Sequence, residues 1–333
     1  MQAPDFWENS PDAPGWKARA LAPLGWLYGR ATARRVRQDG ARVGVPVICI
    51  GNLNAGGVGK TPTVIALGRK LIEQGLNIHV VSRGYGGSAE GPLRVDPARD
   101  EAGKVGDEPL LMAAFFPVWV AKDRAEGCRH AAKAGADLIL LDDGHQNPSV
   151  FKDLTMIVVD AEVGFGNGRC IPAGPLREPV KAGLARADAV LSIGPPEAQE
   201  SFSKQWGSAI SLPHLKGVIR PVETGMEWPG LKAVAFAGIG RPEKFFNTLR
   251  GMGVDLIATH ALADHQEITP ALFNRLKTEA NSKGLPLVTT EKDMMRLPVD
   301  LRRQVVFLPV ALEVEDWSPL EAMVQKLTAK RPG

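Results

Sequence analysis

The stretch from Gly51 to Pro62 holds residue types that bind phosphate groups. It reads GNLNAGGVGKTP, and its spacing is that of a phosphate-binding loop (P-loop) in which Asn54 replaces the usual first glycine. Glycines let backbone N–H groups turn toward one point, and the following helix adds the positive end of its dipole. Lys60 can reach the β- and γ-phosphates, and the Thr61 hydroxyl can bind Mg²⁺. The residues expected to contact a nucleoside triphosphate are Asn54, Ala55, Gly56, Gly57, Val58, Gly59, Lys60, Thr61 and Pro62.

The surroundings of this loop decide between a phosphate site and a glycine-rich turn without a ligand. An apolar run over 45–50 enters the loop, and apolar residues at helical spacing over 62–74 leave it. A strand before the loop and a helix after it form the context in which the motif binds phosphates. The context therefore favours the nucleotide site.

A pair of aspartates supplies a candidate metal site. Asp142 and Asp143 follow the apolar run Leu138–Leu141. A carboxylate at the end of such a strand partners the loop hydroxyl at Mg²⁺ in P-loop proteins. Asp-Asp-Gly is also a common turn, but the strand and the P-loop before it favour metal binding. The expected ligands are Thr61, Asp142, Asp143 and Glu108, with the division of labour among the carboxylates left open.

Three further side chains each leave two interpretations open. Asp107, in VGDEP, suits a helix cap, yet a cap aimed at the phosphate site can also be a reactive carboxylate. Arg177, in IPAGPLREP, lies in a loop stiffened by prolines, where a phosphate contact and a surface salt bridge are equally compatible with the local sequence. His265 follows an aspartate, a pair more typical of a solvated loop than of a site.

The elements that position these residues alternate between strand and helix. Unbroken apolar runs are typical of strands buried on both faces, so the sheet is expected to be mostly parallel and covered by helices. The predicted strands are 45–50, 78–82, 117–121, 137–141, 156–160 and 189–193, and the predicted helices are 62–74 and 124–134. The fold class is therefore α/β, a P-loop NTPase-type, mostly parallel sheet sandwiched by helices.

A second, smaller α/β domain is predicted after a break over 210–227, where prolines and glycines punctuate the chain. Its expected strands are 233–236, 254–259, 285–289 and 305–310, and its helices 242–250, 270–283 and 319–329. The expected division is an N-terminal helical segment (1–40), a P-loop kinase domain (41–212), an extended linker (213–230) and the smaller domain (231–333). A ligand cleft is expected between the two domains.

Composition excludes few classes of protein. The chain has 333 residues, which suits about two domains, and 44% hydrophobic with 23% charged residues is typical of a globular protein. A formal net charge of +3 gives no indication of nucleic-acid binding, and none is expected. Three separated cysteines, without disulfide or zinc spacing, fit a reducing compartment. No run reaches the roughly 18 apolar residues of a membrane span.

The segment 16–42 is basic and amphipathic. Apolar residues recur at helical spacing, with Trp16 and Trp26 as interfacial aromatics. Its basic residues are Lys17, Arg19, Arg30, Arg34, Arg35, Arg37 and Arg42, against Asp39 alone. From these residues alone, a membrane-surface helix and a first helix packed on the domain are equally supported. Pro23 and Gly25 are expected to kink or interrupt the helix.

The ordered set of motifs resembles the tetraacyldisaccharide 4′-kinase family, the lipid A 4′-kinases of Gram-negative bacteria. The motifs are GNLNAGGVGKTP, SRGYGG, VGDEP, LDDGHQN, PAGPLREP, FAGIGRP, a DH loop and TTEKD. The resemblance implies a two-domain P-loop kinase that uses ATP and Mg²⁺ to phosphorylate the 4′-hydroxyl of a lipid A disaccharide 1-phosphate precursor. It places the protein at the cytoplasmic face of the inner membrane and favours membrane contact by 16–42.

The resemblance also implies residue roles. Asp107 matches the family's catalytic aspartate and His265 its supporting histidine, so that Asp107 would orient the sugar hydroxyl and accept its proton. Lys60 and Thr61 match the phosphate and Mg²⁺ ligands, Asp142 and Asp143 the acidic pair, and Arg177 the arginine of the PLRE loop.

The sequence departs from the family at four positions. His145 and Asn147 stand where the family often has phenylalanine and histidine, and Gln266 and Ile268 stand where it tends to have aromatics. Roles of the family residues at these positions are not carried over.

Three other functions remain as alternatives. A P-loop GTPase or metallochaperone would carry an Asn-Lys-x-Asp guanine reader, but Glu291–Asp293 has neither the asparagine nor the spacing. A nucleotide-switched membrane-binding protein would bind vesicles without transferring phosphate. A soluble small-molecule kinase would not need the basic amphipathic segment.

Overall fold

A computed structural model describes residues 4–329. The larger of its two sheets has nine strands, and its neighbouring strands pair in parallel except at the two edges, where β13 and β3 are antiparallel to their neighbours. In order across the sheet, the strands are β13 (Val310–Val314), β8 (His214–Pro221), β7 (Ala189–Ile193), β6 (Leu154–Asp160), β1 (Val47–Gly51), β5 (Leu138–Asp142), β2 (Ile78–Ser82), β4 (Val118–Val120) and β3 (Leu93–Arg94). The predicted α/β fold with a mostly parallel sheet is confirmed.

Helices cover both faces of this sheet because alternate strand residues point to opposite sides. One face packs on α2 (Lys60–Glu73), α4 (Asp107–Met112) and α12 (Ser318–Thr328). The other packs on α5 (Arg124–Lys133), α6 (Val180–Leu184) and α7 (Pro196–Trp206). In β1, Ile48 and Ile50 join the first core while Val47 and Cys49 join the second. Short helices α3 (Ala102–Val105), η1 (Asp5–Trp7) and η2 (Gly207–Ala209) complete this part.

The smaller sheet has four parallel strands in the order β10 (Asp255–Ala261), β9 (Lys232–Ala237), β11 (Leu287–Thr290) and β12 (Val306–Leu308). Helix α8 (Pro242–Gly251) packs on one face and α9 (Pro270–Ser282) on the other. Two short helices, α10 (Glu291–Arg296) and α11 (Val299–Arg302), follow β11. We call residues 222–309 the small unit, and the other described residues the large unit.

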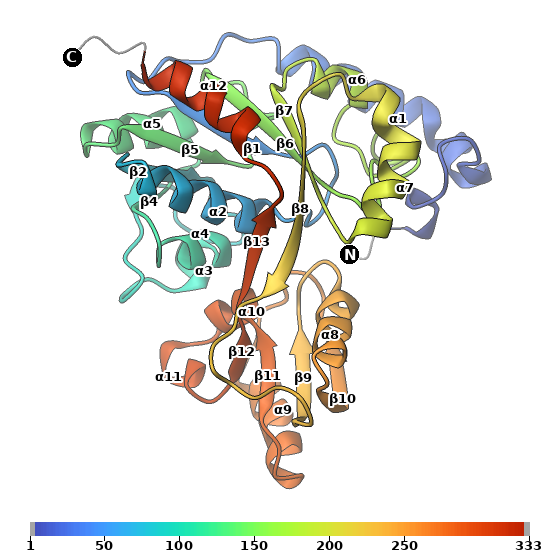
Figure 1. The fold of residues 1–333 in the computed structure, drawn as a ribbon, viewed down its shortest axis with the longest axis vertical. Helices are drawn as coiled ribbons and strands as arrows, with labels where there is room; N and C mark the ends of the chain where they lie inside the picture. The colour runs from blue at the N-terminus through green and yellow to red at the C-terminus, as the bar shows by residue number, and fades with distance from the viewer. Residues whose placement is uncertain (1–3, 330–333) are drawn as a thin grey trace.

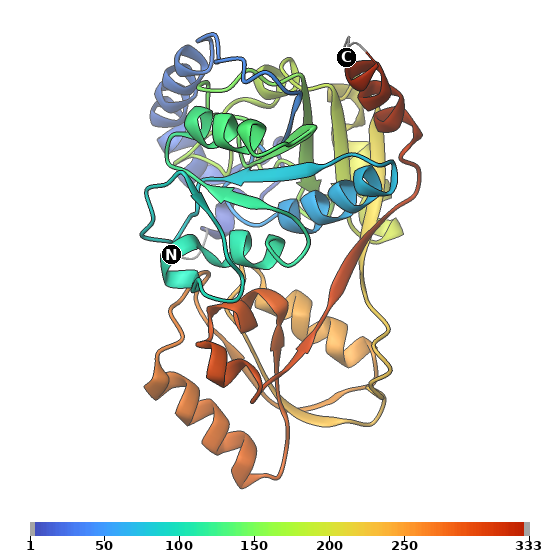
Figure 2. The ribbon, with the colours of Figure 1, turned by 90° about the vertical axis from the view of Figure 1, so that its left-hand side faces the viewer.

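The chain joins the two units through β8 and β13, the paired strands at one edge of the larger sheet, which run side by side toward the smaller unit (Figure 1). The structure therefore differs from the expected division at two points. The expected extended linker 213–230 contains β8, and the last part of the expected smaller domain returns to the large unit as β13 and α12 (Figure 2). Leu320 and Val324 of α12 are buried against the large core, which explains the return.

Helix α1 (Gly15–Arg35) runs through Pro23 and Gly25 without interruption, so the expected break is absent there. Gly25 permits close packing, because a Cβ at this position would lie 2.6 Å from the carbonyl oxygen of Cys170. Trp16 and Trp26 are on its exposed side. Within residues 4–329, no helix has both the length and the apolar character that crossing a bilayer requires.

Candidate active site

A cleft of about 1740 Å³ lies between the two units. The large unit lines it with the P-loop residues Ala55 to Pro62 and with Asp142 and Asp143. The small unit lines it with residues after its strands, including His265 and Lys292. The expected cleft between two α/β parts is therefore present, and it collects most of the side chains singled out from the sequence.

The P-loop connects β1 to α2, as its motif predicted. Gly59 immediately precedes α2 with φ 93°, and Gly56 has φ 118°, conformations that residues with a Cβ adopt only under strain. Lys60 and Thr61 are the first residues of α2. The loop therefore presents backbone N–H groups and a helix N-terminus to the cleft, the arrangement that binds phosphate oxygens.

Asn54 differs from the rest of the predicted nucleotide contacts. Its side chain is buried, its amide donates to the carbonyl oxygen of Gly164 at 3.0 Å, and it is not among the residues that line the cleft. Its carbonyl oxygen accepts from the Asn52 amide at 2.8 Å. The geometry therefore indicates an anchor for the P-loop rather than a side-chain contact with phosphate.

Arg177 is held beside the P-loop by backbone hydrogen bonds. The Arg177 N–H donates to Leu53, and the Ala55 N–H donates to Pro175, both at 2.7 Å. The guanidinium of Arg177 donates from Nη1 to Asp143 Oδ1 at 2.7 Å. Of the two interpretations left open for Arg177, the structure contains the ion pair, and it places that pair on the wall of the cleft.

Asp143 is the anion around which this wall is organised. Lys60 Nζ lies 3.7 Å from its Oδ1, and its carbonyl oxygen accepts from Arg124 Nη2 at 3.0 Å. Burial opposes its negative charge, but Lys60 and Arg177 outweigh burial and hold the pKa of Asp143 below its usual value. Asp143 is therefore charged and already neutralised by protein cations.

Asp142 has a different environment. It is buried, its Oδ2 accepts from the Ser82 hydroxyl at 2.9 Å, and its Oδ1 has no hydrogen-bond partner. Burial, and then the nearby charges of Glu108 and Asp143, raise the pKa of Asp142 to about 7. An unpartnered buried carboxylate oxygen fits a cation, because such a group otherwise remains desolvated without compensation.

The third predicted carboxylate ligand, Glu108, pairs with a protein cation instead. Its Oε1 accepts from Lys292 Nζ of α10 at 3.0 Å. In the described part of the chain, no three acidic, histidine or cysteine side chains converge as a metal site. Mg²⁺ in nucleotide sites needs only one or two carboxylates in addition to phosphate oxygens and water. The geometry therefore favours Asp142 with Thr61 over a three-carboxylate site.

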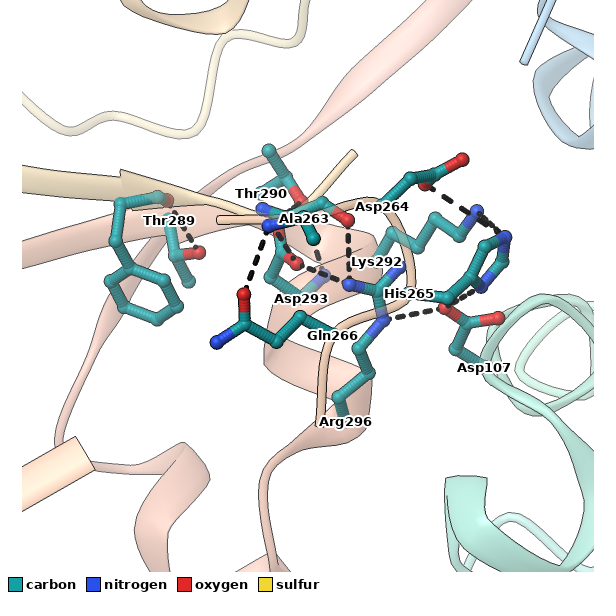
Figure 3. A network of polar contacts seen from close by, with 12 residues as sticks. Asp107, Ala263, Asp264, His265, Gln266, Thr289, Thr290, Lys292, Asp293 and Arg296 are labelled. Atoms are coloured by element: carbon teal, nitrogen blue, oxygen red, sulfur yellow. Dashed lines mark hydrogen bonds and ion pairs between the residues drawn. The ribbon is translucent and has the colours of Figure 1, made fainter. Parts of the chain in front are cut away.

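Asp107 and His265 meet across the two units, as Figure 3 shows. His265 Nδ1 lies 3.2 Å from Asp107 Oδ2, and Arg296 Nε donates to the same oxygen at 2.6 Å. Since Lys292 has only donors and lies 3.3 Å from His265 Nε2, the geometry suits the tautomer that donates from Nδ1 to Asp107. The solvated-loop interpretation of His265 is therefore not what the structure contains.

The carboxylate of Asp107 is strongly held. Gly106, not Asp107, occupies the helix-cap position of α4, and Asp107 Oδ1 accepts from the Glu108 N–H at 2.9 Å. Burial opposes its charge, but the hydrogen bond from His265 and the charges of Lys292 and Arg296 hold the pKa of Asp107 well below its usual range. His265 lines the cleft, whereas Asp107 lies behind it and is not a lining residue.

Arg296 is the residue of this site that sequence reasoning missed. It stands alone in the sequence, after two methionines, and its partner Asp107 belongs to a distant part of the chain. The available signal was its spacing of four residues from Lys292 in TTEKD, which places both cations on one face of a helix.

A second set of ion pairs crosses the cleft elsewhere. Lys244 of α8 lies 2.7 Å from Asp160 and 2.8 Å from Glu162, and Arg241 lies 2.6 Å from Glu8. These contacts join the small unit to the end of β6 and to the N-terminal segment. Ion pairs among the described residues thus join the two units both at Asp107 and at the end of β6.

The four departures from the family pattern have structural roles here. His145 is buried, and its Nε2 contacts the Gly183 carbonyl oxygen at 3.1 Å. Asn147 accepts from the N–H and hydroxyl of Ser149. Gln266 accepts from the Ala263 N–H, and Ile268 is buried in the core of the small unit.

Comparisons with known proteins agree on one family. The family model described as tetraacyldisaccharide-1-P 4′-kinase matches residues 17–329. A tetraacyldisaccharide 4′-kinase of Dinoroseobacter shibae is 61% identical over 98% of each chain, and one of a Jannaschia species is 55% identical over 99% of this chain and 100% of its own. The crystal structure of LpxK from Aquifex aeolicus in complex with ATP superimposes with a TM-score of 0.75 at 25% identity, covering 93% of this chain and 99% of that one.

Proposed function

The chain belongs to the tetraacyldisaccharide 4′-kinase family, and we propose that its cleft transfers the γ-phosphoryl group of ATP to the 4′-hydroxyl of a tetraacyldisaccharide 1-phosphate, a precursor of lipid A. The enzyme is thus an ATP-dependent kinase of lipid A biosynthesis. One observation carries the residue assignment. Lys60 from the large unit and His265 from the small unit line the same cleft, so a nucleotide and an acceptor can meet there.

The P-loop and its lysine hold the donor in this proposal. Backbone N–H groups from Ala55 to Gly59 bind the phosphates, and Lys60 contacts the β- and γ-oxygens. Arg177 and Lys60 both approach Asp143, so each can exchange this carboxylate for a phosphate oxygen at little electrostatic cost. The transition state of phosphoryl transfer is loose, so positioning and charge neutralisation provide most of the catalysis.

Asp142 and Thr61 fit Mg²⁺, since the unpartnered Oδ1 of Asp142 is the kind of oxygen that this ion selects. A bound Mg²⁺ would neutralise charge that develops on the β- and γ-phosphates. Asp143 remains with Arg177 and Lys60, and Glu108 with Lys292, so we assign neither as a direct ligand.

The pair of Asp107 and His265 acts as the proton acceptor. His265 faces the cleft, and Asp107 behind it orients the ring through Nδ1 and stabilises positive charge on it. A carboxylate alone is a poor base toward an alcohol, but the hydroxyl becomes acidic as it is phosphorylated, so a late proton transfer to this pair suffices.

The N-terminal helix provides the route to a lipid acceptor. On α1, Trp16, Leu24, Trp26 and Leu27 are each more than half exposed, and Arg30 stacks over the Trp26 ring at 4.8 Å. Exposed aromatics flanked by basic residues are typical of helices that lie in a membrane interface. Each basic residue near an anionic leaflet contributes about 1 kcal/mol of binding. We therefore propose that α1 holds the kinase at the cytoplasmic face of the inner membrane.

A transfer assay tests the proposed function. Incubation of the protein with γ-labelled ATP and a lipid A disaccharide 1-phosphate in detergent micelles is expected to label the lipid. Excess unlabelled ATP should compete, whereas GTP should not. Nucleotide binding without label on the lipid would contradict the proposal and would favour a nucleotide-switched membrane-binding protein. Label on a water-soluble sugar alone would favour a soluble kinase.

A further inference from the structure

Helix α10 of the small unit presents two cations to two consecutive acids of the large unit. Lys292 and Arg296 are one helical turn apart, and they contact Glu108 and Asp107, the first two residues of α4. Figure 3 shows the Lys292 side chain reaching the His265 ring and the Arg296 guanidinium reaching the Asp107 carboxylate. The face of one short helix thus reaches both members of the Asp107–His265 pair.

Arg296 is anchored in the small unit before it reaches Asp107. Its Nη1 donates to the Gly238 carbonyl oxygen at 2.7 Å and to Asp293 Oδ1 at 2.9 Å, which leaves Nε for Asp107 Oδ2 at 2.6 Å. The side chains of Arg296 and Asp107 are only 7% and 5% exposed. A buried, multiply bonded guanidinium fixes the direction of a carboxylate much better than an exposed pair does.

Arg296 also reaches the backbone that carries His265. The Gly238 carbonyl oxygen accepts from the His265 N–H at 3.1 Å as well as from Arg296 Nη1. His265 has φ 57°, so its loop is held in an unusual conformation for a residue other than glycine. A change at Arg296 therefore affects the carboxylate and the histidine that contacts it.

Lys292 has the matching role on the other side of the imidazole. Its Nζ lies 3.0 Å from Glu108 Oε1 and 3.3 Å from His265 Nε2. The ammonium group of Lys292 therefore contacts α4 through Glu108 and orients the His265 ring at the same time. Since Lys292 belongs to the small unit and Glu108 to the large one, this contact exists only when the two units are together.

We propose that Arg296 and Lys292 are positioning residues for phosphoryl transfer, which dock α10 on α4 and thereby set the geometry of the Asp107–His265 pair. The inference rests on the proposed role of that pair. It assigns to α10 a task that the TTEKD motif did not indicate, since Arg296 does not line the cleft and Lys292 contacts Glu108 and His265.

The charged groups around Asp107 decide the expected pH behaviour. His265 faces it from the loop after β10, Lys292 and Arg296 from α10, and Glu108 is its neighbour on α4. Because the charge of Arg296 helps to lower the pKa of Asp107, its removal favours protonation of Asp107. The acid limb of the pH profile of kcat/KM should therefore move to higher pH when Arg296 is replaced by a neutral residue.

The test compares Arg296→Met, Arg296→Lys and Lys292→Met with the unchanged enzyme in the lipid transfer assay. We expect Arg296→Met to lower kcat about a hundredfold, the size of effect that a misplaced catalytic group causes, with little change in the KM for ATP. Arg296→Lys keeps the positive charge but loses the planar guanidinium, so its kcat should fall less than that of Arg296→Met. The acid limb of its pH profile should stay near that of the unchanged enzyme. Lys292→Met should lower kcat by less.

Two controls separate positioning from general effects. Arg129→Met removes an exposed arginine that pairs with Glu126 on α5, and it should leave kcat unchanged. Lys244→Met weakens the other set of contacts between the units, and it should not shift the acid limb. ATP binding, measured by calorimetry, reports whether each variant is folded. If Arg296→Met does not fold, the comparison is made with Arg296→Lys instead.

The inference is overturned if folded Arg296→Met and Lys292→Met retain the kcat and pH profile of the unchanged enzyme, or if Lys244→Met reproduces the Arg296→Met profile. Asp107→Asn, measured in the same assay, shows whether the positioning inference alone has failed or the proposed role of the Asp107–His265 pair has failed as well. An inactive Asp107→Asn enzyme beside fully active α10 variants would remove only the positioning role. An active Asp107→Asn enzyme would remove the proposed role of the pair itself.

Discussion

The hydroxyl of Ser82 donates to Asp142 Oδ2 at 2.9 Å, and the other carboxylate oxygen of Asp142 remains buried without a partner. Ser82, at the end of β2, thus orients Asp142, at the end of the neighbouring strand β5. The unpartnered Oδ1 of Asp142 remains beside the cleft. Asp143, one residue later, has cations on its carboxylate, so the two adjacent aspartates differ in what they can still bind. This difference allows the metal role to be tested one residue at a time.

Replacing Asp142 by asparagine keeps the shape of the side chain and removes the charge that would face Mg²⁺. We expect Asp142→Asn to lower kcat about a hundredfold or more and to raise the Mg²⁺ concentration needed for half-maximal activity. Ser82→Ala, which loses only the orienting hydrogen bond, should cause a smaller change of the same kind. A Mg²⁺ titration of the transfer rate measures both. Wild-type Mg²⁺ dependence in Asp142→Asn would reject Asp142 as a ligand.

Replacing Asp107 by alanine removes the carboxylate behind His265. We expect kcat to fall by roughly a hundredfold or more, the usual range for loss of a general base, while ATP affinity changes little. Calorimetric titration with ATP and steady-state kinetics with the lipid acceptor separate the two quantities. The control is Asp96→Asn on the exposed loop after β3, which should keep wild-type turnover. Near-normal turnover of Asp107→Ala would exclude the assignment.

The apolar face of α1 should bind membranes without contributing to nucleotide binding. Trp26→Glu and Leu27→Glu place a charge on exposed positions, so the fold should be kept while vesicle binding is lost. Co-sedimentation with vesicles that contain anionic lipid measures the binding, and we expect a higher KM for the lipid acceptor with an unchanged KM for ATP. Ile257→Glu, on exposed β10 of the small unit, is the matched control. Unchanged sedimentation of the α1 variants would contradict a membrane role.

Much of the fold could be predicted from local pattern. The strands at Ile78–Ser82 and Ala189–Ile193 have the predicted bounds, because each is a run buried on both faces. Strands β8 and β13 were not recognised as members of the large sheet. Residues of β8 are mostly half-buried or exposed, and a proline lies at or beside each end of that strand. β8 joins the sheet by pairing with β7, and β13 joins it only by pairing with β8 across residues 222–309, a contact that local pattern does not reveal.

The site was predictable to the extent that its residues lie in short motifs. The P-loop motif indicated Lys60, the aspartate pair after a strand indicated Asp142, and the family resemblance indicated His265; the structure brings all three to one cleft. Arg296 and the Glu108–Lys292 pair could not be found in this way, because each joins helices from different units. Asn54 was placed among the nucleotide contacts by motif position, but its side chain turns inward to Gly164. Contacts between distant segments, rather than residue types, decided these cases.

The buried imidazole of His145 should make stability depend on pH. Burial, followed by the nearby charges of Arg186 and Lys152, lowers the pKa of His145 from its ordinary value of 6.5 to about 3. Between these two values the unfolded chain binds a proton at this site and the folded protein does not. The free energy of unfolding therefore decreases as pH falls from 6.5 toward 3, and this contribution is fully present only above the higher value.

His145→Phe removes the titrating group, and the resemblance to the family indicates that phenylalanine is a common residue at this position. The variant loses the hydrogen bond to the Gly183 carbonyl oxygen, a cost that does not vary with pH. Between about pH 7 and about pH 5, the unfolding free energy of wild type relative to His145→Phe should decrease by about 2 kcal/mol. Urea denaturation of both proteins across this interval measures the difference. A difference that stays constant with pH would show that the pKa of His145 is the same in the folded and unfolded protein, and would contradict this prediction. A difference that instead increases toward pH 5 would show that His145 is protonated in the folded protein, with the carboxylate of Glu178, 3.7 Å away, as its partner.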